Sequence, residues 1–343
     1  MKHPYRIREI ATRAGLSLAT VDRVLHQRGG VRESTAREVH QAIAELDRQQ
    51  AEALSGDSAA GPTVLVDVVV AGPPRFAAAV RQALEAEIPE LRPAVVKARF
   101  HPGGDPVERL DRVGRSRGQG LILSAPATPA VVEAVGQLGV PVVALGTDLP
   151  ESKRLAYAGI DHADAGATAA YLVEQWLAER AGDVLLVLGE AVGFDERAAG
   201  FRAEMANRAP NRRLLEAGAG ALAAVLAGNP AIRAIYAPAG GGSAAVVDAF
   251  AAEHRNYDVF VAHDLDAENA ALLREQKLSA VLHHDLRAEL RHACRTILRA
   301  RGVLTGPIRS HPAAIQVITP FNTPPVQIFR PPAVRFRRVR STP

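Results

Sequence analysis

Several features that would define a function class are missing from this chain of 343 residues. Cys294 is the only cysteine, so no intramolecular disulfide can form and a reducing compartment is expected. No apolar run reaches the roughly 18 residues of a membrane-spanning helix. Residues Met1 to Arg6 lead into the first expected helix without an apolar signal segment. We therefore expect a cytoplasmic protein with no membrane partner.

The motifs of catalysis and of metal binding are also missing. There is no nucleophile elbow, no paired acid–base motif and no dinucleotide fingerprint, which argues against an enzyme. The histidines of the second half lack the helical pairing with a nearby acid that zinc enzymes use, and cysteine ligands are missing. Neither a metal nor another cofactor is expected. The histidines considered are His254, His263, His283, His284 and His292.

The composition indicates a globular protein of more than one domain. Hydrophobic residues make up 48% and charged residues 23%, which is typical of a soluble globular chain. The length exceeds that of one ordinary domain, so two or three are expected. The formal net charge of +4 suits a nucleic-acid partner without requiring one.

The most informative stretch covers residues 7–25, which reads as two short amphipathic helices joined by a tight turn. Apolar residues at i, i+3, i+4 and i+7 from Ile7 share one face of the first helix. Gly15 supplies the freedom that a sharp turn needs, and Ser17 is a good N-cap for the second helix. A helix-turn-helix places the start of its second helix against base edges in the major groove. The stretch therefore predicts DNA binding.

The order of residues in this stretch resembles the headpiece of the LacI/GalR family of bacterial repressors. The similarity rests on Ile7–Ala11, Ala14–Ser17 and Ala19–Leu25, and it continues into a third apolar stripe at Val39, Ile43 and Leu46. It implies double-stranded operator DNA as a partner. It also implies a homodimer, with a tetramer left open, whose paired headpieces read a near-palindromic site. The alternative is a small helical domain that binds a protein.

The resemblance implies that Leu18, Ala19 and Arg23 face the bases. Arg23 can bond guanine with two N–H groups, whereas Leu18 and Ala19 offer only apolar contact. Asp22 departs from the serine common at its position. A carboxylate beside phosphates is unfavourable unless it pairs with Arg23 or accepts a bond from cytosine. A solvated helix charge is the alternative interpretation of Arg23.

Other residues of the DNA side are expected to position the protein without reading sequence. Ser17, Thr20 and His26 are candidates for phosphate contacts. Family members usually follow the headpiece with a hinge helix that carries Pro-Asn, and residues 46–54 lack that pair. Leu54 is a candidate for the apolar wedge in the minor groove, or else an ordinary helix residue.

The remainder of the chain alternates between expected strands and helices. A linker-like composition at 55–62 precedes it, and a run of β-branched residues at 64–70 starts the pattern. Repeated strand–helix units predict parallel sheets covered by helices on both faces. Strands are expected at 64–70, 94–100, 120–124, 141–145, 184–188, 234–237 and 259–262, with helices at 76–87, 106–115, 129–138, 163–180, 197–207, 221–227 and after 243.

This second part resembles the periplasmic-binding-protein-like effector domain of the same family. The signatures are Asp148–Pro150, Gly159–Asp161, Arg197–Phe201 and Ile318–Pro324. The implied fold is α/β, with an N-terminal three-helix helix-turn-helix headpiece followed by a two-lobed domain with two parallel sheets flanked by helices. The implied parts are a headpiece at 1–48, a hinge or linker at 49–62 and an effector-binding domain at 63–343. Lobe one takes about 63–159 and 286–317, and lobe two takes about 160–285 and 318–343.

Ligands of open α/β sheets lie outside the carboxyl ends of the strands, so the effector site is sought there. The resemblance carries Arg197, Asp264 and His284 to positions that usually bond the ligand. A structural ion pair or helix cap is the alternative for every candidate. The further candidates are Arg75, Phe76, Ser124, Asp148, Asp161 and Ser243.

The sequence thus predicts a ligand-responsive DNA-binding transcriptional regulator, a repressor by resemblance, that senses a sugar, a polyol or a related small carbohydrate. One alternative is a solute-binding module without a regulatory role. Another is a regulator with a phosphorylated or acidic effector, because Gly240–Ser243 follows a strand and opens a helix, a geometry that binds anions.

Overall fold

The computed structural model describes residues 7–26, 31, 33–53, 61–178, 180–189 and 195–324. The chain divides into two compact units. One unit comprises residues 1–158 with 286–311, and the other comprises 159–285 with 312–343. The headpiece and lobe one belong to the first unit, and lobe two forms the second. Each part is described by itself.

Three helices form the headpiece around a small core of their own. They are α1 (Ile7–Ala14), α2 (Leu18–Leu25) and α3 (Glu33–Ala53). Gly15 makes the turn between α1 and α2 with a positive φ of 66°. Ile10, Val21 and Val39, one from each helix, are completely buried against each other. The predicted three-helix headpiece is confirmed.

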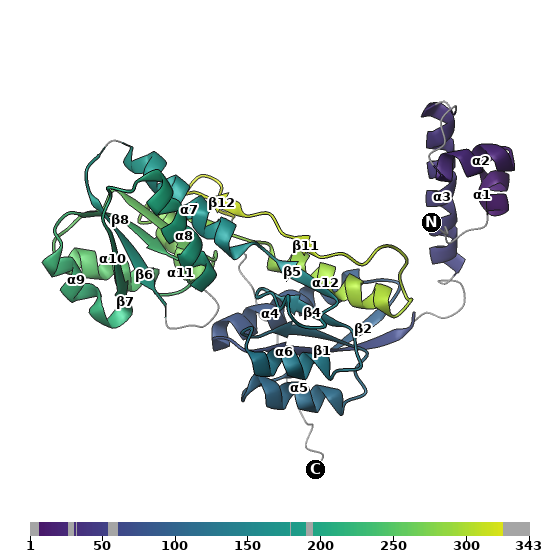
Figure 1. The fold of residues 1–343 in the computed structure, drawn as a ribbon, viewed down its shortest axis with the longest axis horizontal. Helices are drawn as coiled ribbons and strands as arrows, with labels where there is room; N and C mark the ends of the chain where they lie inside the picture. The colour runs from purple at the N-terminus through teal and green to yellow at the C-terminus, as the bar shows by residue number, and fades with distance from the viewer. Residues whose placement is uncertain are drawn as a thin grey trace, which may run out of the picture. The chain divides into compact units, whose positions relative to one another are not determined.

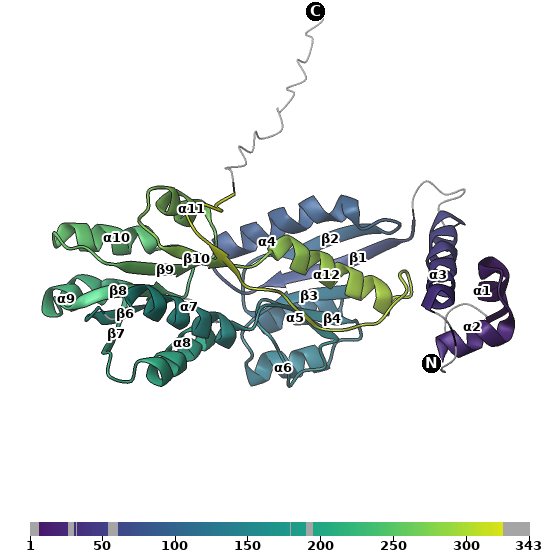
Figure 2. The ribbon, with the colours of Figure 1, turned by 90° about the horizontal axis from the view of Figure 1, so that it is seen from above.

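Lobe one is a sheet with helices on both faces (Figure 2). Its sheet order is β11-β5-β4-β3-β1-β2, and β1 to β5 pair in parallel. Val66 packs with α4 and α12, whereas Val69, on the opposite face of the same strand, packs with α5 and α6. The elements are β1 (Thr63–Val70), α4 (Pro74–Glu87), η1 (Ile88–Glu90), β2 (Val95–His101), α5 (Pro106–Gly114), β3 (Gly120–Ser124), α6 (Pro129–Gly136), β4 (Val142–Leu145), β5 (Ala156–Gly159), α12 (Leu286–Ala300) and β11 (His311–Pro312).

Lobe two repeats this architecture (Figure 1). Its sheet order is β12-β10-β9-β8-β6-β7, in which β12 alone among the paired strands described runs antiparallel. Helices α7 and α8 cover one face, and α9, α10 and α11 cover the other. The elements are α7 (His162–Leu177), β6 (Asp183–Leu188), α8 (Asp195–Arg208), β7 (Leu214–Gly218), η2 (Ala219–Ala221), α9 (Leu222–Gly228), β8 (Ile232–Ala237), α10 (Ser243–Ala252), β9 (Val259–His263), α11 (Ala267–Arg274), β10 (Ala280–His283) and β12 (Gln316–Ile318).

The predicted fold class is confirmed, and the element bounds add detail to the expected divisions. The third change of lobe falls at 311/312 instead of near 318, because β12 already pairs with β10 of lobe two. Residues 49–53, expected in the linker, continue α3. Leu54 lies outside the described residues. No helix within the described ranges is long and apolar enough to cross a membrane.

The strand orders define where each lobe can hold a ligand. In lobe one, β1 and β3 are neighbours, and the next strand along the chain lies on opposite sides of this pair: β2 beside β1 and β4 beside β3. In lobe two, β6 and β8 are such a pair, with β7 beside β6 and β9 beside β8. Such switch points leave a crevice at the carboxyl ends of the two strands. Residues that contact an effector are therefore expected around these ends.

Candidate DNA-reading surface and effector site

Helix α2 presents one face to the headpiece core and the opposite face to solvent. The Ser17 hydroxyl accepts the backbone N–H of Thr20 at 3.2 Å and so begins the helix. Val21 is fully buried, which fixes the rotation of α2 against its neighbours. Leu18, at 53% exposure, then faces outward together with Ala19 and Arg23. A single exposed leucine is common on protein surfaces, so it is the position of Leu18 at the start of α2, and not its exposure, that makes it a candidate base reader.

The polar residues of α2 bond mainly to each other. Asp22 Oδ1 lies 3.0 Å from His26 Nδ1, one helical turn further on. The hydroxyls of Ser17 and Thr20 lie 2.8 Å apart. The Asp22 carboxylate therefore has a partner on its own helix. The contacts of Ser17, Thr20 and His26 with phosphates stay predictions.

Lobe two gathers a charged cluster beneath the start of α7. Two glycines allow α7 and α8 to approach closely: a Cβ on Gly166 would lie 1.9 Å from the carbonyl oxygen of Arg197, and one on Gly200 would lie 2.1 Å from that of Ala163. The close approach brings the Arg197 side chain, which is 2% exposed, against His162. Its Nε donates to His162 Nδ1 at 3.1 Å.

Arg197 also joins the strand ends of the sheet. Its Nη1 donates to the Pro238 carbonyl at 2.9 Å and to Asp264 Oδ2 at 3.4 Å. The same carboxylate oxygen accepts the backbone N–H of Gly240 at 3.2 Å. His284 Nε2 lies 3.8 Å from the other oxygen, Oδ1. The structure thus brings together Arg197, Asp264 and His284, which the sequence proposed as one group.

Asp264 is held in a strained and strongly charged environment. Its φ of +64° is rare for a residue with a side chain, and such strain is concentrated at functional sites. Burial alone would raise the pKa of Asp264, but Arg197 and, after it, the neighbouring imidazole of His284 hold it well below its ordinary value. The carboxylate is therefore ionised at all physiological pH values and can accept bonds from ligand hydroxyls.

Two residues of this cluster were not predicted from the sequence as effector-site candidates. His263 is 1% exposed, and neither ring nitrogen has a hydrogen-bond partner among the described residues. Burial, together with the charge of Arg197, lowers the pKa of His263 well below its ordinary value. Its ring meets Tyr236 edge-on at 5.6 Å, and Tyr236 stacks on Phe201 at 4.4 Å. No local motif marks His162, because only the packing of α7 on α8 brings it to Arg197.

Asp161 and the turn that carries Ser243, the two further candidate positions of lobe two, have internal contacts that compete with a ligand. The Asp161 carboxylate accepts the backbone N–H of Asp164 at 2.9 Å and caps α7. At the glycine-rich turn, the backbone N–H groups of Gly242 and Ala244 both donate to Glu268 Oε1 at 3.0 Å. A carboxylate already occupies the start of α10, which disfavours a phosphate there. Ser243 is buried beside it, and its hydroxyl has no partner among the described residues.

The candidates of lobe one form a smaller group at the carboxyl ends of β1, β3 and β4. A Cβ built on Gly146 would lie 3.8 Å from the Phe76 ring tip and 3.9 Å from Ser124 Oγ, so these three residues border one space. Arg75 is exposed at the start of α4. Asp148 is bonded by both Nε and Nη2 of Arg154, which matches the structural ion pair expected as its alternative role.

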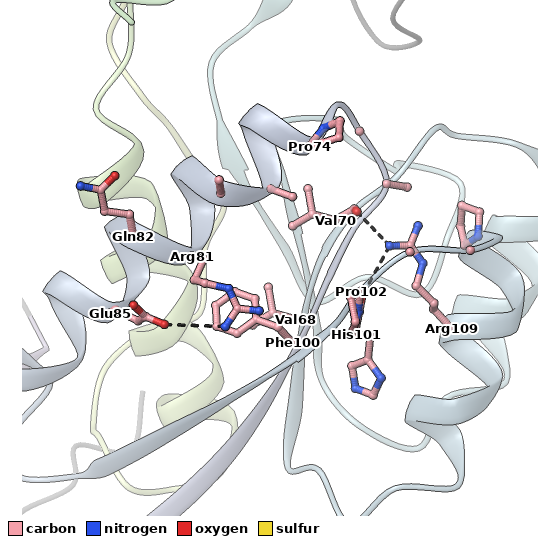
Figure 3. A pocket seen from close by; sticks show the side chains of 17 residues that line it. Val68, Val70, Pro74, Arg81, Gln82, Glu85, Phe100, His101, Pro102 and Arg109 are labelled. Carbon is pink, nitrogen blue, oxygen red and sulfur yellow. Dashed lines mark hydrogen bonds and ion pairs between the residues drawn. The ribbon is translucent and has the colours of Figure 1, made fainter. Parts of the chain in front are cut away.

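A groove of about 710 Å³ lies on the outer side of α4, against β2 and the loop that follows it (Figure 3). Within the groove, the guanidinium carbon Cζ of Arg81 lies 3.9 Å from the centre of the Phe100 ring. At the other end, Arg109 Nη1 donates to the carbonyls of Val70 and His101 at 2.9 and 3.5 Å. None of the predicted effector residues lines this groove.

Comparison with known families agrees with both parts of the chain. Residues 120–302, more than half of the chain, match the family described as "Periplasmic binding protein domain". Residues 6–48 match "Bacterial regulatory proteins, lacI family". The chain belongs to the LacI family of bacterial regulators. No curated protein matches the chain significantly.

Solved structures share the fold of the LacI-family effector domain at low identity. A protein assigned to the LacI transcriptional regulators, from Bacteroides fragilis, is 14% identical with a TM-score of 0.67, over 76% of this chain and 98% of that one. GanP, a glucose-galactose binding protein from Geobacillus stearothermophilus, is 17% identical with a TM-score of 0.66, over 76% and 99%. A carbohydrate transporter from Acidothermus cellulolyticus 11B, in complex with myo-inositol, is 17% identical with a TM-score of 0.65, over 76% and 96%.

The family match at the headpiece includes the helix that carries the predicted base readers. The match at 6–48 includes α1, α2 and most of α3. Leu18, Ala19 and Arg23 project from the helix that this family model includes, on the face that the headpiece core leaves open.

Proposed function

We propose that this LacI-family chain is a repressor that binds operator DNA as a homodimer. Its affinity for the operator then falls or rises when a small carbohydrate binds. The observation that carries the DNA half is the exposed face of α2, with Leu18, Ala19 and Arg23 outward and Val21 buried. The N-terminal residues of a recognition helix meet base edges in this arrangement. Two headpieces would read two half-sites of a near-palindromic operator.

The effector half rests on the Arg197–Asp264 pair at the carboxyl edge of the lobe-two sheet. A guanidinium that donates and a carboxylate that accepts suit adjacent hydroxyls of a sugar or polyol. Neighbours of the same fold are described as binding glucose and galactose or hold myo-inositol. Glu268 at the start of α10 weighs against a phosphorylated effector.

The DNA half is tested by selection of duplexes from a random pool by the full chain. We expect enrichment of a near-palindromic sequence, and sedimentation of the protein as a dimer. Random recovery of duplexes would contradict the proposal.

The effector half is tested by thermal unfolding of the protein with pentoses, hexoses, polyols and sugar phosphates. A ligand that binds only the native state raises the free energy of unfolding by mass action, by about 2.7 kcal/mol at one hundred times its Kd, and the thermal midpoint rises with it. A hit among uncharged sugars or polyols must also change affinity for the selected duplex. Hits confined to sugar phosphates would favour the acidic-effector alternative.

A further inference from the structure

The amino ends of the lobe-one strands surround the point where the chain arrives from the headpiece. A Cβ on Gly61 would lie only 1.7 Å from the Pro93 carbonyl oxygen, so the arriving chain touches the segment before β2. Gln119, just before β3, donates its backbone N–H to the Leu65 carbonyl at 2.7 Å, and its side chain accepts from the Leu65 N–H at 3.0 Å. The segments that precede β2 and β3 therefore flank the start of β1.

Four exposed basic side chains lie on these segments or on the elements beside them, and we call them the entry patch. Arg92 precedes Pro93, and Arg117 lies two residues before Gln119. Arg301, just after α12, donates its Nε to the Gln119 carbonyl at 2.5 Å. The fourth member stands on β2, opposite Leu65 in the register of β1 and β2. The entry patch is Arg92, Lys97, Arg117 and Arg301.

The entry patch keeps its charge, whereas nearby arginines are neutralised. Arg99 bonds the buried carboxylate of Asp67, and Arg115 pairs with Asp111. No ion pair joins an entry-patch residue to a carboxylate within the part of the chain that the structure describes. Glu90, two residues before Arg92, is an exposed acid that forms no ion pair with the patch among the described residues.

We propose that the entry patch binds DNA phosphates on the operator that the headpiece holds. This inference rests on the proposed function, since it needs DNA at the headpiece. From Ala53 at the end of α3 to Gly61 the chain has eight peptide steps, which span at most about 28 Å. The tether therefore holds the start of lobe one within about 28 Å of the end of α3, on the headpiece that we propose to hold the operator. Phosphate contacts release counterions and add affinity without reading sequence.

The test compares the wild-type chain with a variant that carries Arg92→Gln, Lys97→Gln, Arg117→Gln and Arg301→Gln. The probe is the duplex that the wild-type chain selects, and affinity is measured by fluorescence anisotropy between 50 and 200 mM salt. Removing one phosphate interaction lowers the slope of log K against log salt by about 0.9, which is about 3.5-fold in affinity over this range. We expect weaker binding at low salt, a shallower slope, and unchanged preference for the selected duplex over a scrambled one.

A matched control removes four exposed positive charges elsewhere through Lys153→Gln, Arg233→Gln, Arg274→Gln and Lys277→Gln, and it should keep the wild-type slope. Circular dichroism and the thermal midpoint verify that both variants fold. If the entry-patch variant kept the wild-type slope and affinity, the inference about the patch would be overturned. The proposed function would not be affected, because the wild-type chain would still select its duplex. An equal loss in the control would overturn the inference too, since general charge would then explain the effect. Failure of the wild-type chain to bind any duplex would refute the proposed function together with the patch.

Discussion

Arg197 and His162 are joined by a hydrogen bond between two buried side chains, with the arginine Nε donating to the histidine Nδ1 at 3.1 Å. For Nδ1 to accept, that nitrogen must carry no proton, so the imidazole serves as a neutral acceptor. The bond, with the contacts of Nη1 to Pro238 and Asp264, fixes the plane of the guanidinium. His162 is thus a positioning residue for the group that we propose to bind the effector.

Replacing His162 should affect effector binding according to whether an acceptor remains. In His162→Asn the amide oxygen occupies nearly the position of Nδ1 and keeps the bond, whereas His162→Leu leaves a buried donor without a partner. Such a loss costs about 1–3 kcal/mol. We expect effector affinity, measured by calorimetry, to fall about 5- to 150-fold in His162→Leu and to stay near wild type in His162→Asn. Equal losses in both variants would show that the histidine does more than accept this bond.

His263 should make the stability of the protein depend on pH in weakly acidic solution. Its pKa in the folded protein lies well below 6.5, so on acidification the unfolded chain takes up a proton that the folded chain refuses. Stability therefore falls as pH drops below about 6.5, by at most about 1.4 kcal/mol per pH unit for this one group. His283, whose pKa burial also lowers, adds to the same slope.

The measurement is the thermal midpoint between pH 5 and 7.5. His263→Phe should flatten the dependence, and it also removes two buried nitrogens that lack partners among the described residues. His283→Phe is the comparison, because the His283 Nδ1 accepts the backbone N–H of Leu265 at 3.3 Å and its removal leaves that donor unpaired. If His263→Phe kept the full wild-type slope, the proton uptake would belong to another group.

The fold was predictable from the sequence wherever hydrophobic period and turn residues agreed. The strand at 120–124 has the expected bounds, because its five residues are apolar or small and all are buried. Strand β7 was missed, since Leu214–Gly218 carries a glutamate and lies at the edge of the sheet with only one of its five residues buried. The continuation of α3 to Ala53 has a local explanation, because Gln, Ala and Glu are good helix formers.

The candidate site was predictable only in part, because tertiary packing decides which polar groups meet. Arg197 and Asp264 lie next to a helix and a strand that the alternating pattern indicates, whereas His284 came from the family resemblance alone, because the strand before it, β10, was not expected. His162 reaches Arg197 only through the close approach at Gly166 and Gly200, and no sequence period announces such an approach. Asp148 and Asp161 are located at the expected ends, yet Arg154 and the α7 amides occupy their oxygens.

Glu87 should be essential to the packing of α4 on α12. Its carboxylate is completely buried and accepts Nε of Arg287 at 2.6 Å and Nε of Arg291 at 2.5 Å. Hydrogen bonds from Arg291 hold the pKa of Glu87 below its ordinary value against the effect of burial, and Arg287 adds to this. The contribution is present above about pH 4.5 and is lost as pH falls below it. We expect Glu87→Gln to lower the free energy of unfolding by about 1–3 kcal/mol in urea titrations at pH 7.

The two arginines are half exposed, so water can solvate them after the change and limit the cost. Arg291→Gln alone should therefore destabilise less than Glu87→Gln. If the difference between wild type and Glu87→Gln stayed the same at pH 3.5 and pH 7, the charge of Glu87 would have no part in its role.

Arg23 allows the reading of bases to be separated from the attraction of phosphates. Arg23→Lys keeps the positive charge on α2 but loses the planar fork that bonds guanine through two N–H groups, whereas Arg23→Ala loses both. We expect either variant to lower discrimination between the selected duplex and its single-base variants by about 10- to 100-fold, as one bidentate contact would. Only Arg23→Ala also removes the positive charge, so it alone should reduce the slope of log K against log salt, by up to the value of about 0.9 that one neutralised phosphate contributes.

Because Arg23 is exposed and outside the core of Ile10, Val21 and Val39, the thermal midpoint of both variants should match the wild type. Full discrimination by Arg23→Lys would mean that a point charge suffices and that the fork does not read a base.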